Sequence, residues 1–307
     1  MALNEYGDPD VLQLTEIADP PVGPDRVLVQ VHAAGVNPVD AKIRAGQLRD
    51  SRPHHEPLVP GFDMAGVVVQ VGAAVTRFAV GDHVIGCVRE GHLQNGAYAE
   101  LVSAPEHTVA RKPESVSFAE AAALPLAGLT ALQACQAAQL VQGDIVLVHN
   151  ASGGVGHLAV QIADLMGAGM VIGTTSERNY DFVQSLGARP LHYGDKLEAQ
   201  VSDLLDGDCV VDAALDFVGG EAAEQSVRLL RRPDRHVSVV DSNVARHGGR
   251  YVFARPDGTA LAQLSELLDS GRLLVHVQQV LELAQAPDAH RIIEDGHVRG
   301  KLVLHVR

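Results

Sequence analysis

The chain has 307 residues, of which 46% are hydrophobic and 20% charged, a composition typical of a globular protein with two domains or one large one. Asp and Glu outnumber Lys and Arg by 38 to 24, and the formal charge of -14 argues against a nucleic-acid-binding surface. The three cysteines lie far apart and form no CxxC pair, so neither a sequence-local zinc site nor a disulfide framework is expected.

No basic segment followed by an apolar one opens the chain, so no secretory leader is expected. The longest apolar stretch, residues 119–132, contains Glu120 and Pro125 and is shorter than the roughly 20 residues that span a bilayer. These features predict a cytoplasmic protein.

Residues 1 to about 115 are rich in Val, Gly and Pro and predict short strands. In "DRVLVQVHAAGVN" (25–37), Val27, Val29 and Val31 alternate on one face of a strand. Further short strands separated by glycine turns are expected within residues 61–75 and 81–88. This pattern predicts a small twisted β-barrel.

Beyond residue 115 alanine dominates, and strands then alternate with helices, which predicts βαβ units and a parallel sheet covered on both faces. The expected strands are residues 145–149, 170–174, 209–213 and 236–240, with a last short one near 251–253. The helices expected between them are residues 156–166, 179–186 and 221–230. An amphipathic helix over 260–273, a shorter helix over 289–297 and a closing strand over 300–306 end the chain.

The glycine cluster "ASGGVG" (151–156) lies between a predicted strand and a predicted helix, the context required for a dinucleotide fingerprint. Ala151, Gly153 and Gly156 occupy the three fingerprint positions; the second glycine admits a pyrophosphate and the third allows close helix packing. The helix N-terminus directs N–H groups at the phosphates. The expected cofactor-binding residues here are Ser152, Gly153, Gly154, Val155 and Gly156. The alternative is a tight turn without a ligand.

The end of the second strand distinguishes the two nicotinamide cofactors. Thr174 and Ser176 are neutral and Arg178 follows, which favours a 2′-phosphate, because a guanidinium binds phosphate through two hydrogen bonds. Glu177 is the competing signal, since an acidic residue near this position binds the ribose 2′-OH of NAD. Arg178 and Glu177 can also be read as solvated residues at a helix start. NADP(H) is the expected cofactor.

Together these motifs resemble the medium-chain dehydrogenase/reductase family, in particular its zinc-independent quinone oxidoreductase (zeta-crystallin-like) and alkenal/enone reductase group. The resemblance covers nearly the whole chain in order. The matching stretches include "AGVNPVDAKIRAG" (34–46), "VPGFDMAGVVVQVG" (59–72), "AAALPLAGLTALQA" (121–134), "VLVHNASGGVGHLAVQIA" (146–163), "DFVGG" (216–220) and "GHVRGKLVL" (296–304).

The resemblance implies an α/β fold in which a GroES-like β-barrel domain, residues 1–115 and 256–307, is interrupted by a Rossmann doubly wound domain, residues 116–255. The opening "MALNEYG" is shorter than in relatives of this kind, so we expect a shortened first strand. Zinc-dependent relatives carry a cysteine near Val36-Asn37, a His-Glu pair at Phe62-Asp63 and a cysteine-rich lobe. None of these ligands is present here, and no metal is expected.

The implied reaction is reduction, by NADPH, of a quinone or of an α,β-unsaturated carbonyl at its β-carbon, because a metal-free site loses the usual stabilisation of an alkoxide. Asn37 and Asp40 match family positions beside the nicotinamide, and Lys42 stands where many quinone reductases have Tyr. Their structural alternatives are a turn residue, a helix cap and a surface lysine respectively. Further cofactor contacts implied by the resemblance are Thr130, Tyr193, Phe217, Gly219, Ser238, Val239 and, more weakly, Lys301.

Three functions remain open at this stage. The favoured one is the quinone or enone reductase; the others are an enoyl reductase acting on a specialised biosynthetic acyl chain and a non-enzymatic, crystallin-like NADPH-binding protein. Family members dimerise through the last Rossmann strand, so a homodimer pairing the edge near 251–253 is expected.

Overall fold

The computed structural model describes residues 1–50, 53–207 and 209–307. The chain divides into two compact units: unit 1, Met1–Leu126 with Pro256–Arg307, and unit 2, Ala127–Arg255. The expected boundary at 255/256 coincides with this division, whereas residues 116–126, expected in the second domain, belong to unit 1. The reason is the short helix α2 (Phe118–Ala122), which packs on the barrel so closely that a Cβ at Gly35 would lie 2.4 Å from the Ala122 carbonyl oxygen.

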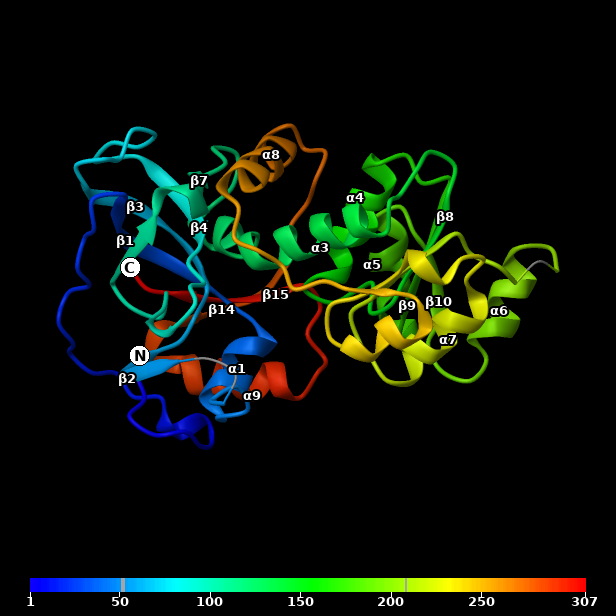
Figure 1. Ribbon diagram of the computed structural model, residues 1–307, viewed down its shortest axis with the longest axis horizontal. Coiled ribbons are helices and arrows are strands. Elements are labelled where there is room, and N and C mark those ends of the chain that lie inside the picture. The colour runs from blue at the N-terminus through cyan, green and yellow to red at the C-terminus, as the bar shows by residue number, and fades with distance from the viewer. Residues whose placement is uncertain (51–52, 208) are drawn as a thin grey trace. The chain divides into compact units, whose positions relative to one another are not determined.

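Unit 1 is built on a curved sheet with the order β14-β15-β1-β3-β4-β7, and β6 also pairs with β1 (Figure 1). Neighbouring strands are antiparallel except β14 and β15. The strands are β1 (Arg26–Val36), β3 (Asp63–Val71), β4 (His83–Cys87), β6 (Leu101–Pro105), β7 (Val109–Arg111), β14 (Val277–Glu282) and β15 (Lys301–His305), and a separate pair is β2 (His54–Val59) with β5 (Leu93–Asn95).

The predicted alternation of β1 is confirmed, since Val27, Val29 and Val31 are fully buried. The strand is antiparallel to both β3 and β6, and its carboxyl end leads directly into a helix at Asn37. Ala2 and Leu3 form single bridges rather than a strand. The helices of unit 1, besides α2, are α1 (Pro38–Arg44), α8 (Gly258–Asp269) and α9 (Ala286–Glu294), and short 3-10 helices cover Pro9–Val11, Glu106–Thr108 and Leu283–Gln285.

Unit 2 is a doubly wound parallel sheet with the order β10-β9-β8-β11-β12-β13, and helices cover both of its faces (Figure 1). Its strands are β8 (Ile145–Val148), β9 (Met170–Thr175), β10 (Arg189–His192), β11 (Ala213–Asp216), β12 (His236–Ser238) and β13 (Arg250–Tyr251). Its helices are α3 (Pro125–Ala137, which begins in unit 1), α4 (Gly156–Leu165), α5 (Tyr180–Ser185), α6 (Leu197–Leu204) and α7 (Glu221–Leu229), with 3-10 helices at Glu177–Asn179, Pro233–Arg235 and Ser242–His247.

The sheet of unit 2 encloses an aliphatic core around Leu147, Ile172 and Leu229. Its strand order reverses direction between β8 and β11, and ligands of open α/β sheets bind at such a point, beside the carboxyl ends of the strands.

One strand prediction was wrong in position: the segment expected at 209–213 forms β11 only from Ala213. Before Ala213, Val211 pairs with another segment instead: it forms an isolated bridge with Leu230, and its N–H donates to the Leu229 carbonyl oxygen at 2.8 Å. The other expected strands and helices are confirmed with ends shifted by a few residues, and none of the helices within the described ranges is long and apolar enough to cross a membrane.

Candidate active site

The glycine cluster lies at the carboxyl end of β8 and opens α4, as the sequence predicts. A Cβ at Gly156 would lie 2.0 Å from the Asn150 carbonyl oxygen, so no larger residue fits where the helix meets the strand. A Cβ at Gly153 would lie 2.5 Å from the Asn150 side-chain amide. Asn150 itself has a φ of 54°, which places the turn in the left-handed region. The glycines at positions 153 and 156 therefore let the backbone of this turn pass close to Asn150, as the tight turn of a phosphate-binding loop requires.

The first turn of α4 supplies the donors of this site. The leading N–H groups of a helix have no intrahelical acceptor, and the helix dipole favours an anion in front of them. The Gly153 N–H already donates to the Asn150 carbonyl oxygen at 3.0 Å, so within the turn from Ser152 to Gly156 the donors that fit the pyrophosphate of a dinucleotide are the N–H groups leading into α4, those of Gly154 to Gly156. Two hydrogen bonds also hold this turn in place: the Ser152 hydroxyl oxygen accepts from Thr175 Oγ1 at 2.9 Å and from Asn179 Nδ2 at 3.1 Å.

The residues expected at a 2′-phosphate separate into two groups in the structure. Thr174 is only 2% exposed, and its hydroxyl oxygen accepts a hydrogen bond from the Asn150 N–H at 3.2 Å, so it supports the glycine turn. Ser176 is half-buried and Arg178 is exposed, just after the carboxyl end of β9. Of the three, Ser176 and Arg178 are accessible to a ligand.

Other expected cofactor residues lie at the same edge of the sheet, because the carboxyl ends of parallel strands share one edge. Asp216, which ends β11, accepts hydrogen bonds from the N–H groups of Val218 at 2.9 Å and Gly219 at 2.8 Å, and from Ser238 Oγ at 2.7 Å. The structure thus brings together the turn after β8 and the expected residues Phe217, Gly219, Ser238 and Val239, while the exposed Tyr193 follows β10 and Thr130 is buried in α3.

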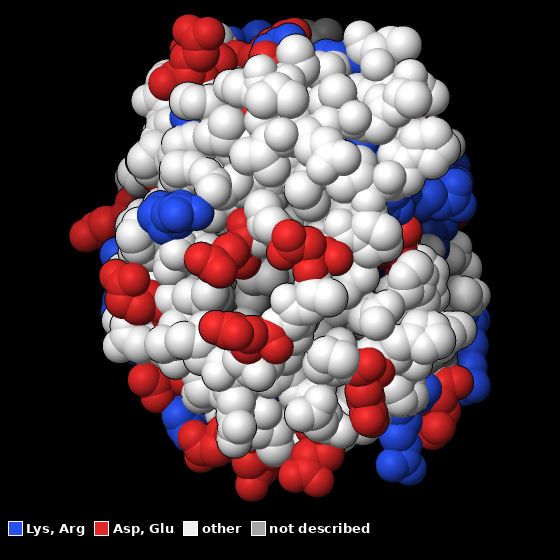
Figure 2. Space-filling view, turned by 90° about the vertical axis from the view of Figure 1, so that its left-hand side faces the viewer, with Lys and Arg blue, Asp and Glu red and all other residues white. Residues whose placement is uncertain are grey.

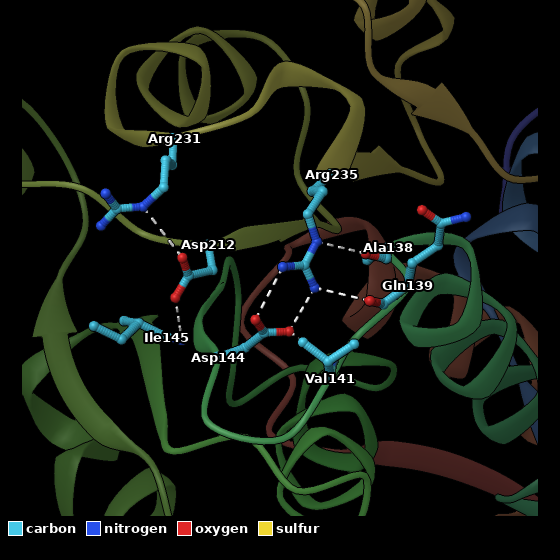
Figure 3. A network of polar contacts seen from close by, with 8 residues as sticks. All are labelled: Ala138, Gln139, Val141, Asp144, Ile145, Asp212, Arg231 and Arg235. Atoms are coloured by element: carbon cyan, nitrogen blue, oxygen red, sulfur yellow. Dashed lines mark hydrogen bonds and ion pairs between the residues drawn. The ribbon is translucent and has the colours of Figure 1, made fainter.

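The opposite, amino-terminal edge of the sheet is occupied by a closed ion-pair network (Figure 3). The Arg235 guanidinium donates to Asp144 Oδ1 at 2.9 Å, to the Ala138 carbonyl oxygen at 3.0 Å and to the Gln139 carbonyl oxygen at 2.9 Å. Asp144 also accepts from the Val141 N–H at 2.7 Å. The side chain of Arg235 is 10% exposed and that of Asp144 is 6% exposed, so both are almost fully buried. This network holds the starts of the strands together.

Unit 1 contains a buried cluster of polar side chains at the start of α1. Lys301 Nζ donates to Asn37 Oδ1 at 2.5 Å and to the Val36 carbonyl oxygen at 2.8 Å. Asn37 Nδ2 donates to Asp63 Oδ2 at 2.8 Å, and that carboxylate oxygen lies 3.7 Å from Lys301 Nζ. The amide of Asn37 is therefore held at both ends, with its carbonyl oxygen toward a cation and its NH₂ toward a carboxylate.

The cluster continues from Asp40 into the barrel. Asp40 Oδ2 accepts from the Asn37 N–H at 2.8 Å, as an acid in the first turn of a helix does, and from the Tyr98 hydroxyl at 3.3 Å. The Tyr98 hydroxyl lies 3.4 Å from His290 Nε2 on α9. Asp40, Tyr98 and His290 have no exposed surface. Asp40 Oδ1 and His290 Nδ1 have no hydrogen-bond partner among the described residues.

Burial shifts the pKa values of this cluster toward the neutral forms. It raises the pKa of Asp40 to about 7, with Asp63 adding to the shift and the Asn37 N–H opposing it. It also raises the pKa of Asp63, against the opposing effect of Lys301, and lowers the pKa of Lys301. The pKa of His290 falls to about 4, again mainly by burial. Perturbed values of this kind mark candidate functional sites when charged groups and geometry converge.

The structure brings Asn37 and Asp40 together but places Lys42 elsewhere, exposed on α1. Lys301, expected more weakly at the cofactor, is the lysine of the buried cluster. Asp63, Tyr98 and His290 are not among the site residues expected from the sequence, where Asp63 is noted only at the position of a missing zinc ligand. Nothing in the local pattern around His290 distinguishes it from an ordinary residue of an amphipathic helix.

Among residues 1–50, 53–207 and 209–307, no three His, Cys, Asp or Glu side chains are grouped closely enough to hold a metal ion. The Asn37 side-chain oxygen already accepts from Lys301 Nζ, and Phe62 has no donor atom.

Comparisons with known proteins agree with this architecture. Residues 23–114 match the alcohol dehydrogenase GroES-like domain, and residues 186–304 match a domain described as zinc-binding dehydrogenase. The chain is 36% identical to 2-methylene-furan-3-one reductase of Solanum lycopersicum, over 98% of this chain and 77% of the relative. It is 34% identical to a chloroplastic NADPH-dependent alkenal/one oxidoreductase of Arabidopsis thaliana, over 98% of this chain and 78% of that protein.

A solved structure shows the same fold. The quinone oxidoreductase from Coxiella burnetii superposes with a TM-score of 0.88 at 35% identity and covers 100% of this chain and 98% of its own. The chain therefore belongs to the medium-chain dehydrogenase/reductase family and, within it, to the group of quinone oxidoreductases and alkenal/enone reductases.

Proposed function

We propose that the chain is an NADPH-dependent reductase that delivers hydride to a quinone or to the β-carbon of an α,β-unsaturated carbonyl, without a metal ion. The observation that carries this proposal is the buried cluster of unit 1. Asn37 has its amide oriented by Lys301 and Asp63, so its second Nδ2–H, which has no partner among the described residues, can donate to a substrate oxygen.

The cofactor supplies the hydride. The turn from Ser152 to Gly156 would hold its pyrophosphate. Ser176 and Arg178 would bind the 2′-phosphate, because both are accessible after the carboxyl end of β9 and a guanidinium pairs well with phosphate. A relative named as NADPH-dependent supports this choice. The remaining expected residues at the same edge, Phe217, Gly219, Ser238 and Val239, would line the cofactor.

A conjugated acceptor suits the groups present in unit 1. Reduction of an isolated carbonyl concentrates negative charge on one oxygen, which zinc stabilises in metal-dependent relatives. Reduction of an enone or a quinone spreads that charge over a conjugated system, and hydrogen-bond donors suffice. Asn37 is the proposed donor, Lys301 and Asp63 orient it, and Asp40 fixes the start of α1. Lys42 takes no part in this proposal, because its side chain is exposed.

The other two functions considered from the sequence are not better supported. Relatives named as alkenal/one and quinone oxidoreductases match over nearly the full chain, and these names describe oxidoreductases rather than a structural role. The proposed homodimer would pair the edge strand β13, in which Tyr251 is 43% exposed; Phe253, two residues beyond the strand, is 51% exposed. The cytoplasmic location stays a prediction.

The test is cofactor consumption by the purified chain with NADPH and with NADH, against a quinone, a 2-alkenal, a cyclic enone and the matching saturated ketone. We expect turnover with NADPH on the conjugated acceptors only. Arg178→Ala should raise the KM for NADPH by about tenfold to a hundredfold and leave that for NADH unchanged, because one charged hydrogen-bonding partner is lost.

The matched control is Arg189→Ala, an exposed arginine on β10, which should change neither KM. Reduction of the saturated ketone at a comparable rate, or equal use of NADH and NADPH by the unmodified chain, would contradict the proposal.

A further inference from the structure

A buried histidine lies directly before the glycine turn of unit 2, and no step above uses it. His149 follows β8, is only 1% exposed and donates its N–H to the Leu215 carbonyl oxygen at 2.9 Å. Its ring lies between two hydroxyl groups: Nε2 is 2.9 Å from Ser226 Oγ on α7, and Nδ1 is 3.3 Å from Thr174 Oγ1 on β9. Because the ring is buried, any effect on a ligand must pass through these neighbours.

The direction of each hydrogen bond in this chain follows from its far end. The Ser226 hydroxyl donates to the Ala222 carbonyl oxygen at 3.1 Å, so its oxygen is left to accept from His149 Nε2–H. Burial lowers the pKa of His149 to about 4, against the opposing effect of Asp216, so the ring is neutral near pH 7 and carries one proton. With that proton on Nε2, Nδ1 is an acceptor and receives the hydrogen of the Thr174 hydroxyl.

The Thr174 hydroxyl oxygen then directs its lone pairs toward the glycine turn. It accepts from the Asn150 N–H at 3.2 Å, and the Thr174 carbonyl oxygen accepts from the Ala151 N–H at 3.0 Å. Asn150 determines the shape of the turn, because its φ of 54° is left-handed and its carbonyl oxygen accepts from the Gly153 N–H at 3.0 Å. The acceptor on His149 therefore keeps the hydroxyl hydrogen away from the Asn150 N–H and holds the hydroxyl oxygen toward it.

Local donors of this turn matter because the chain as a whole is acidic. Its formal charge is -14, and acidic side chains gather around the middle of the face of unit 1 shown in Figure 2. A dinucleotide carries phosphates, so it gains little from the overall charge of the chain. Its affinity depends on how well the N–H groups at the start of α4 are placed.

We propose that His149 is a positioning residue of the cofactor site, which fixes the Thr174 hydroxyl and through it the Asn150 backbone, and so keeps the turn in the shape that binds the pyrophosphate. The inference rests on the proposed function and adds to it a residue that touches neither cofactor nor substrate. Because NADPH and NADH share the pyrophosphate, His149 should matter equally for both. Arg178, in contrast, should matter for NADPH alone.

The experiment measures the Kd of NADPH and of NADH by calorimetry for two variants of nearly equal shape, His149→Leu and His149→Asn. The leucine side chain leaves the buried Thr174 hydroxyl without its acceptor and should weaken both cofactors about tenfold, the change in affinity that about 1.4 kcal/mol represents. The asparagine side chain carries an oxygen at the position of Nδ1 and should restore most of the affinity. Equal Kd values in the two variants would overturn the proposal.

A ligand without a pyrophosphate separates an effect on the turn from a general distortion of unit 2. Adenosine 2′-phosphate would contact Ser176 and Arg178 but not the turn, so its Kd should be the same in His149→Leu as in the parent chain. A loss of affinity for adenosine 2′-phosphate equal to that for NADPH would contradict the positioning role.

His236→Leu is the matched control. His236 lies on β12 of the same sheet, is also 1% exposed, and neither of its ring nitrogens has a hydrogen-bond partner within the described part of the chain. Its replacement should leave both Kd values unchanged. A loss of affinity as large as that of His149→Leu would show that burial of a histidine in this sheet, and not the contact with Thr174, is what matters.

A second variant tests the same route without changing the histidine. Thr174→Val removes the hydroxyl at nearly constant shape and should weaken NADPH and NADH as much as His149→Leu does. If His149 acts through this hydroxyl, the double variant should bind no more weakly than Thr174→Val alone. Additive losses would overturn the proposal.

Binding and turnover together separate this inference from the proposed function. If the parent chain binds NADPH but reduces no enone, the proposed function fails, whereas a tenfold loss of affinity in His149→Leu still supports the positioning role. If a folded His149→Leu variant keeps both Kd values and reduces the enone, the role of His149 is rejected and the proposed function stands.

Discussion

The two units each bury an ion pair, and the two pairs differ in how completely their polar atoms are used. In unit 2, the Arg235 guanidinium is shared between Asp144 and two backbone carbonyl groups, and Asp144 also accepts from a backbone N–H (Figure 3). In unit 1, Lys301 and Asp63 are joined through the amide of Asn37, while the neighbouring Asp40 keeps one carboxylate oxygen without a partner among the described residues.

The pKa shifts follow this difference. The hydrogen bonds from Arg235 lower the pKa of Asp144, so the network of unit 2 favours the charged forms. In unit 1, burial outweighs pairing: the pKa values of Asp40 and Asp63 rise and that of Lys301 falls. A network whose polar atoms are all paired, as in unit 2, stabilises a fold. A cluster whose pKa values are shifted toward the neutral forms, as in unit 1, can respond to the charge that develops on a substrate. The predictions below test this contrast.

The largest effect is expected from Arg235→Leu. Asp144 would remain buried without its cation, and the free energy of unfolding should fall by about 3 kcal/mol or more, as measured by urea denaturation. The control is Arg232→Leu, which removes an exposed arginine paired with Asp234 and should leave stability nearly unchanged. Equal effects of the two substitutions would mean that the Arg235–Asp144 pair is not buried in solution.

The effect of removing a carboxylate on stability should depend on pH at Asp40 but not at Asp144. The folded-state pKa of Asp40, about 7, lies above its ordinary value, so the folded chain binds more protons at this group than the unfolded chain, and its contribution to stability is lost as pH rises to about 7. Asp40→Asn removes this titration. The stability of the variant relative to the parent should therefore rise by about 3 kcal/mol between pH 5 and pH 8.

Asp144→Asn is the opposite case. Because the pKa of Asp144 is lowered, its contribution is present above its ordinary pKa and is lost only as pH falls through the lowered value. The cost of this substitution should be the same at pH 5 and pH 8. A pH-dependent stability cost for Asp144→Asn, or a pH-independent one for Asp40→Asn, would contradict the conclusion that unit 2 favours the charged carboxylate and unit 1 the neutral one.

The smallest effect concerns the tyrosine hydroxyls of unit 1. Tyr98→Phe removes the donor to Asp40 and should cost about 1 kcal/mol of stability, the usual value for a single buried hydrogen bond. Tyr6→Phe is the matched control, because the buried Tyr6 hydroxyl has no partner within the described part of the chain, and its removal should be neutral or slightly stabilising. Thermal denaturation of both variants distinguishes the two outcomes.

The sequence predicted the fold well because its periodicities are strong: the alternating valines of β1 and the strand–glycine–helix order around Gly156 depend only on neighbours along the chain. It misplaced β11, because Val211 bridges to Leu230, a pairing that only the folded chain makes. The cluster of unit 1 was only half predicted. Asn37 and Asp40 lie within one motif, whereas Lys301 contacts Asn37 across 264 positions of the chain and His290 contacts Tyr98 across 192, and only the packed structure brings them together.

The most direct test of the central claim is a double-mutant cycle on Asn37 and Lys301, with kcat/KM for NADPH-dependent enone reduction as the readout. If Lys301 acts by orienting the Asn37 amide, Lys301→Met should lower kcat/KM, and Asn37→Ala combined with Lys301→Met should lower it no further than Asn37→Ala alone. Lys196→Met, at an exposed lysine of unit 2, should leave the rate unchanged. Additive losses from the two substitutions, in variants that remain folded, would contradict the account.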